Sequence, residues 1–97
     1  MRLEYATRFD KSLRRLPPHD RQRAADTLEQ IVRYCETRQA TSGLGLTKLF
    51  SSEELGAVFE VRISRALRLL FTVKQDAVTF VTVGNHDEVR RFIRTFQ

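Results

Sequence analysis

The stretch from Ala57 to Asp87 constrains the fold most, because it contains three apolar runs of strand length separated by short polar segments. The runs are AVFEVRI, LRLLFTV and AVTFVTV, in that order. Successive residues of a strand point to opposite faces, so Phe59 and Val61 share one face while Glu60 and Arg62 share the other. The pattern predicts a three-stranded antiparallel meander whose first strand is charged on one face.

The turn between the second and third runs sets the register between them. A two-residue loop at Gln75-Asp76 joins the two strands as a hairpin. This loop predicts that Phe71 pairs with Phe80 and that Arg68 pairs with Val83.

The turn between the first and second runs has a further consequence. The apolar faces of the two strands coincide only if the loop has an odd number of residues, most simply Ser64-Arg65-Ala66. Arg62 and Arg68 then lie opposite each other, and opposed like charges destabilise a sheet. An anion bound over the pair would remove this cost. Two alternatives stay open: both arginines are solvated, or Glu60 neutralises one of them.

The rest of the chain adds helices before and after the meander in the sequence. Residues 2–7 alternate as a short strand, residues 9–16 have helical spacing, and Pro17-Pro18 separates them from a long helix over 18–38. Residues 37–56 are predicted to be loop-like, with Lys48-Leu49-Phe50 as a strand start or an anchor. Asp87 is predicted to cap a final helix over 88–96, whose buried side comprises Val89, Phe92, Ile93 and Phe96.

The predicted order is therefore β-α-α-β-β-β-α. We expect one α+β domain over residues 1–97, with an antiparallel sheet and helices packed on one of its faces. The N-terminal strand has no hairpin partner nearby, so it must pair with a distant strand of the meander.

Composition limits the kinds of partner and the cellular compartment that we expect for this chain. The net charge of +5 indicates an anionic partner: nucleic acid, an acidic protein or a membrane surface. The apolar runs are too short to span a membrane, and no signal peptide begins the chain. Cys35 is the only cysteine, which excludes an internal disulfide and suits the cytoplasm. Its apolar helical position favours a core role over a reactive thiol.

Two histidines are available for acid–base chemistry. His19 follows the two prolines and is predicted to lie on the surface. His86 stands between a strand and a helix, where it could move a proton near neutral pH or simply bond the loop backbone. Neither metal-ligand spacing nor a nucleophile elbow is present, so we expect no metal and no cofactor.

With metal sites and serine nucleophiles set aside, the candidate site is a basic cluster with one histidine. It comprises Lys48, Arg62, Arg68 and His86, with Glu60 nearby on the same face. Positive charges that hold a phosphate, together with a group that moves a proton, can cleave RNA with its own 2′-hydroxyl as nucleophile. Arginine suits the phosphate because its planar fork binds two oxygens at once. Glu60 is the candidate general base, and two basic turn residues, Arg65 and Lys74, are candidate RNA contacts.

Three segments give this chain a resemblance to a known family. They are Lys48-Leu49, the two arginine-bearing runs FEVRI and LRLLF, and Val83-Gly84-Asn85-His86-Asp87-Glu88-Val89. In their order and spacing they resemble the RelE/ParE superfamily of toxins from bacterial toxin–antitoxin pairs. The resemblance covers nearly the whole chain and implies a RelE-like fold.

The resemblance also implies an activity. RelE-like members cut messenger RNA in the ribosomal A site and so stop translation. Arg62 and Arg68 match arginines of the two central strands, Lys48 falls near the basic residues before them, and His86 matches the proton-transferring histidine of some branches. The implied partners are mRNA, the ribosome and an acidic antitoxin.

Two other functions remain open. ParE-like members share the fold but inhibit DNA gyrase and generally lack the histidine, so His86 favours RNA cleavage. A third reading is a basic protein- or RNA-binding module without toxicity.

Overall fold

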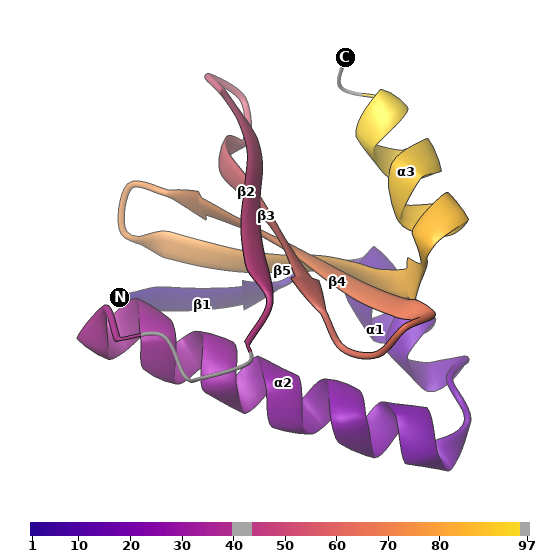
Figure 1. The fold of residues 1–97 in the computed structure, drawn as a ribbon. Coiled ribbons are helices and arrows are strands. Elements are labelled where there is room, and N and C mark those ends of the chain that lie inside the picture. The colour runs from indigo at the N-terminus through magenta and orange to yellow at the C-terminus, as the bar shows by residue number, and fades with distance from the viewer. Residues whose placement is uncertain (40–43, 96–97) are drawn as a thin grey trace.

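Five strands form one mixed sheet in the computed structural model, which describes residues 1–39 and 44–95 (Figure 1). The strands lie in the order β1-β5-β4-β3-β2. Their bounds are β1 Arg2–Tyr5, β2 Leu46–Ser52, β3 Gly56–Arg62, β4 Leu67–Lys74 and β5 Ala77–Asn85. The helices are α1 Thr7–Arg14, α2 Pro18–Thr37 and α3 His86–Arg94. The prediction for Phe96 lies outside the described residues.

The predicted meander is confirmed as β3, β4 and β5, and so are most of its pairings. Phe71 pairs with Phe80, and Arg62 lies opposite Arg68. The pairing of Arg68 with Val83 is wrong, because Arg68 lies opposite Gly84. The register shifts by one residue between Leu70 and Phe71, where β5 contains an extra residue, and such a bulge leaves no reliable mark in the sequence.

The loop predicted over residues 37–56 is wrong for its second half, which forms β2, and of the two alternatives for Lys48-Leu49-Phe50 the strand is the one observed. Residues 40–43 of that predicted loop lie outside the described residues. This strand pairs antiparallel with β3 at the edge of the sheet. Its sequence, LTKLFSS, does not alternate cleanly, because the register shifts between Lys48 and Phe50 and breaks the two-residue period. The observed order is therefore β-α-α-β-β-β-β-α.

The N-terminal strand does pair with a distant strand of the meander, as predicted. β1 runs parallel to β5, with Arg2 beside Ala77 and Tyr5 beside Phe80. The sheet is therefore mixed, and the expectation of a wholly antiparallel sheet is wrong. Within the described residues, no helix is both long enough and apolar enough to cross a membrane.

The helices cover both faces of the sheet rather than one. α1 and α2 pack on one face, where Phe9 and Ile31 join Phe71 in the larger core (Figure 1). α3 packs on the opposite face, against a smaller core around Val58 and Leu70. The one-face prediction fails because β3 and β4 carry apolar residues on both faces, a pattern typical of strands covered on both sides.

Candidate active site

A cleft of about 500 Å³ lies where the ends of β3 and β4 meet the first turn of α3. The structure brings together in it the four residues predicted to be catalytic, although they come from three different elements. Three further residues complete the wall. The lining residues are Gly45, Thr47, Glu60, Arg62, Arg68, His86 and Arg90.

The turn between β3 and β4 places the two arginines side by side. Ile63 N–H donates to Leu67 O at 2.9 Å, which leaves Ser64-Arg65-Ala66 as the predicted three-residue loop. Because directly opposed residues of an antiparallel pair point to the same face, Arg62 and Arg68 both face the cleft. The opposed like charges expected from the sequence are therefore present.

Arg68 is held firmly in place. Its Nε lies 3.1 Å from Glu60 Oε1, and the two side chains are only 12% and 15% exposed. Its Nη1 donates to Ser64 O at 2.8 Å and to Arg65 O at 3.2 Å. The guanidinium thus donates to main-chain oxygens of the β3–β4 turn and orients the Glu60 carboxylate. Of the alternatives left open by the sequence, neutralisation by Glu60 is the one observed for Arg68.

Arg62 differs from its neighbour. Its side chain is exposed, and it forms no ion pair among the described residues. Its main-chain N–H donates to Gly45 O at 3.3 Å, which ties β3 to the start of β2. Arg62 is therefore the strand arginine that keeps a charge available to an anion in the cleft.

His86 is the first residue of α3, and a capping box fixes that start. Asn85 Oδ1 accepts from Glu88 N–H at 2.8 Å, and Asn85 N–H donates to Glu88 Oε1 at 3.1 Å. The cap is therefore Asn85, and the predicted cap at Asp87 is wrong. A fixed helix start holds the exposed imidazole of His86 at the mouth of the cleft.

This arrangement combines three chemical functions in one solvent-open cleft. Glu60 supplies a carboxylate that can accept a proton, and His86 supplies an imidazole that can donate one near neutral pH. Guanidinium groups can stabilise charge that develops on a phosphate. These are the groups that phosphodiester cleavage by an internal hydroxyl requires.

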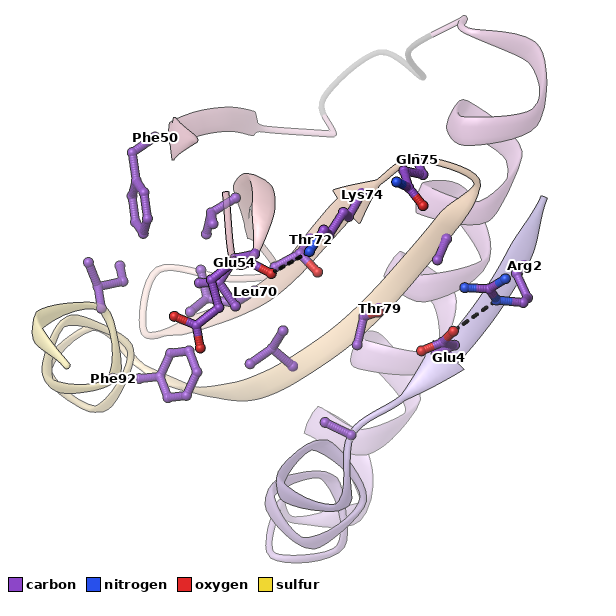
Figure 2. Close-up of a pocket in the computed structure, with 16 residues that line it drawn as sticks. Arg2, Glu4, Phe50, Glu54, Leu70, Thr72, Lys74, Gln75, Thr79 and Phe92 are labelled. Carbon is purple, nitrogen blue, oxygen red and sulfur yellow. Dashed lines mark hydrogen bonds and ion pairs between the residues drawn. The ribbon is translucent and has the colours of Figure 1, made fainter. Parts of the chain in front are cut away.

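The other predicted RNA contacts lie outside the cleft. Lys48 pairs with Phe59, so its side chain projects toward the face that α2 covers, and its expected place on the face of Glu60 is wrong. Arg65 is on the exposed β3–β4 turn, beside the cleft. Lys74 lies at the other end of β4 in a separate groove, where its Nζ donates to Glu54 O at 3.1 Å (Figure 2).

Two further expectations concern metal and thiol chemistry. In residues 1–39 and 44–95, no group of three or more His, Cys, Asp or Glu side chains is placed to hold a metal ion. Cys35 is half-buried against the larger core, and desolvation raises the pKa of its thiol above the ordinary value of 9.0. His19 is exposed, as predicted.

Comparison with solved structures identifies the fold. No protein-family model matches this sequence, and no curated protein matches it by sequence. A chain of the E. coli DinJ–YafQ complex matches with a TM-score of 0.67 and 16% identity, over 92% of this chain and 98% of that chain. This chain has a RelE-like fold.

Two further solved structures have the same fold, and one of them is an antitoxin–toxin complex. The RelE–RelB complex from Pyrococcus horikoshii matches with a TM-score of 0.66 and 15% identity, over 87% of this chain and 92% of that chain. The RelB–RelE antitoxin–toxin complex from Methanococcus jannaschii matches with a TM-score of 0.65 and 18% identity, over 92% and 96%. At such identities the likeness shows the fold alone, and function rests on the site.

Of the three cleft residues that the sequence reasoning missed, one is charged. Arg90 lines the cleft from α3, one turn after His86. Residues four apart lie on the same side of a helix, so the spacing of His86 and Arg90 was the available signal. Arg90 adds a third arginine to the cleft lining, beside the two on the strands.

Proposed function

We propose that this protein is the toxin of a toxin–antitoxin pair and acts as a metal-independent endoribonuclease on messenger RNA bound to the ribosome. The single observation that carries the proposal is the convergence of Glu60, Arg62, Arg68 and His86 on one cleft. The RelE-like fold supports it, because the RelB–RelE structure from Methanococcus jannaschii is an antitoxin–toxin complex. Such an enzyme acts in the cytoplasm, where its substrate is translated.

In the proposed reaction Glu60 removes the proton from the ribose 2′-hydroxyl. The 2′-oxygen forms a bond to the adjacent phosphorus, and the bond from phosphorus to the 5′-oxygen breaks. His86 donates a proton to that leaving oxygen. The products are a 2′,3′-cyclic phosphate and a 5′-hydroxyl, so no water, metal or protein nucleophile enters this step.

The three arginines have different roles in the proposed reaction. Arg62 and Arg90 bind the phosphate oxygens, whose negative charge grows in the transition state. Arg68 is committed to Glu60 and to the turn, so it orients the base and adds charge from one side. Removing one charge-stabilising group is expected to lower the cleavage rate about 10²–10³-fold.

The proposed partner is an acidic antitoxin. With a net charge of +5, the chain favours a negatively charged segment that covers the basic face and folds on binding. Affinity should fall as salt rises, because screening weakens attraction between exposed charges. Affinity that stays constant from low to high salt would argue against an electrostatic cover.

The deciding experiment is primer extension on a reporter message after brief induction of the protein, with His86→Ala beside the wild type. We expect cuts within translated codons for the wild type and none for His86→Ala. His19→Ala is a matched control, because His19 is exposed and lies away from the cleft. Intact message with arrested growth would instead favour a gyrase-type inhibitor, and intact message with normal growth would favour a non-toxic binding module.

A further inference from the structure

The outer edge of β1 is an open pairing surface. β1 is the terminal strand of the sheet, and all its residues are exposed. Among the residues that the structure describes, the exposed large hydrophobic side chains are Met1, Leu3 and Tyr5, at 51%, 37% and 47%. An exposed edge strand with apolar side chains is a template for another strand. The opposite edge, β2, is interrupted by its register shift and is less suited to pairing.

Alternate residues of β1 use their main-chain groups toward β5. Arg2 N–H donates to Asp76 O at 2.7 Å, and Ala6 N–H donates to a carbonyl of β5 at 3.0 Å. In a parallel pair the even-numbered residues of β1 therefore face β5 with both groups. The N–H and C=O groups of Leu3 and Tyr5 consequently point to the outer edge.

The side chains of β1 divide by charge between the two faces. Arg2 and Glu4 lie on the face opposite α2, where Arg2 Nε approaches Glu4 Oε1 at 2.9 Å (Figure 2). Leu3 and Tyr5 lie on the other face, and Tyr5 stacks on Phe80 with 5.2 Å between ring centroids. One face of β1 thus carries two opposite charges, and the other face is apolar.

We infer that two copies of this protein associate through antiparallel pairing of their β1 strands, with Leu3 of one copy opposite Leu3 of the other. In this register Arg2 of each copy faces Glu4 of the other, and Met1 faces Tyr5. The central hydrogen-bonded pair then falls on Leu3 of each copy, whose main-chain groups point outward, whereas the Met1 amine lies 3.5 Å from Asp76 Oδ1 of its own chain. The two sheets join into one continuous sheet.

The charge pattern selects this register over its neighbours. A shift of two residues in one direction puts Arg2 opposite Arg2, and a shift in the other direction puts Glu4 opposite Glu4. Directly opposed like charges are destabilising, whereas opposed unlike charges stabilise the pair. A shift of one residue would oppose outward groups to groups already used by β5. The strand is therefore self-complementary in one register.

The size of the contact predicts a weak dimer. A single edge of four residues buries less area than a standard protein interface, which places it in the transient class. We expect a dissociation constant on the order of 10⁻⁵ M, so that monomer and dimer exchange with protein concentration. This inference does not depend on the proposed ribonuclease activity.

A charge-swap experiment tests whether Arg2 and Glu4 meet across the interface. By sedimentation equilibrium, Arg2→Glu alone and Glu4→Arg alone should each weaken the wild-type dimer about tenfold or more, because both opposed pairs become like-charged. An equimolar mixture of the two variants should restore wild-type association, because each pair again joins opposite charges. Glu53→Arg is the matched control, since Glu53 is exposed on the β2–β3 turn and its reversal should leave the dimer unchanged.

Cross-linking gives a second, independent readout. In a Cys35→Ser background, Leu3→Cys should form a disulfide-linked dimer under mild oxidation. Hydrogen-bonded antiparallel residues have Cα atoms about 5.5 Å apart, within the range of a disulfide. Glu4→Cys in the same background should cross-link poorly, because the two new thiols are out of register. A monomeric wild type at 10⁻³ M, an unrestored mixture, or equal cross-linking of both cysteine variants would each overturn the inference.

Discussion

The ion pair between Glu60 and Arg68 leads to a quantitative prediction for Glu60→Gln. Removing one partner of a fully buried pair costs about 3–5 kcal/mol, because the other charge is left uncompensated. Here both side chains keep 12–15% exposure, the new amide oxygen can still accept from Arg68 Nε, and Nη1 keeps its main-chain oxygens. We therefore expect the free energy of unfolding to fall by about 1–3 kcal/mol.

The same change should affect catalysis far more than stability. A general base contributes about 10²–10⁴-fold, and an amide cannot accept the proton, so cleavage should fall by that factor in protein that remains folded. Urea denaturation gives the unfolding free energy, with an unchanged slope confirming the same folded state. Cleavage of a ribosome-bound message by the same samples gives the rate. Glu53→Gln, on an exposed turn, is the matched control and should stay within about 0.5 kcal/mol.

Two results would refute this reasoning, and they are separable. Cleavage at the wild-type rate by Glu60→Gln would show that Glu60 is not the base. Unfolding at the wild-type urea concentration would show that the ion pair adds nothing to stability. Loss of cleavage with stability retained would leave Glu60 with a chemical role alone.

Four further predictions concern other residues of the cleft, the α3 cap, the β2–β3 turn and α2. Arg90→Ala should lower initial cleavage rates about 10²–10³-fold, whereas Arg91→Ala should keep the wild-type rate because Arg91 is outside the cleft lining. Equal losses in both variants would contradict the role of Arg90 in binding phosphate. Asn85→Ala should lower the urea-measured free energy of unfolding by about 1 kcal/mol through loss of the capping box, and no change would contradict the cap. Gly56→Ala should lower the free energy of unfolding by more than about 1 kcal/mol in the same assay, because Gly56 has φ +77° and a Cβ there would overlap the main chain of β4. Wild-type stability of this variant would contradict the argument. Iodoacetamide should modify Cys35 more slowly than a free thiol at pH 7.5, and the rate should rise through and above pH 9 because burial raises its pKa; fast labelling at pH 7.5 would contradict this.

Alternation and loop parity were sufficient to predict the centre of this fold. The two-residue period of the three runs fixed which residues share a face, and a three-residue loop forced Arg62 and Arg68 together. The position of His86 between a strand and a helix also followed from local sequence. Each of these features depends on residues close together in the chain, where pattern and geometry agree.

The features that were not predicted depend on long-range contacts. β2 is a polar edge strand with an irregular register, so it shows little periodicity, and its pairing put Lys48 beside Phe59 rather than near Glu60. The bulge in β5 moved Gly84 opposite Arg68 and changed the pairing there. Apolar residues on both faces of β3 and β4 could not show which face α3 would take, because alternation marks only a sheet with one solvated face.

The parallel pairing of β1 with β5 also governs when the protein can fold. Arg2 lies beside Ala77, so the first strand to leave a ribosome has no partner until the last strand follows it. His86 and Arg90 lie beyond even that strand. During synthesis the sheet and the cleft are therefore completed at nearly the same time, because β5 and the first turn of α3 follow each other directly in the chain.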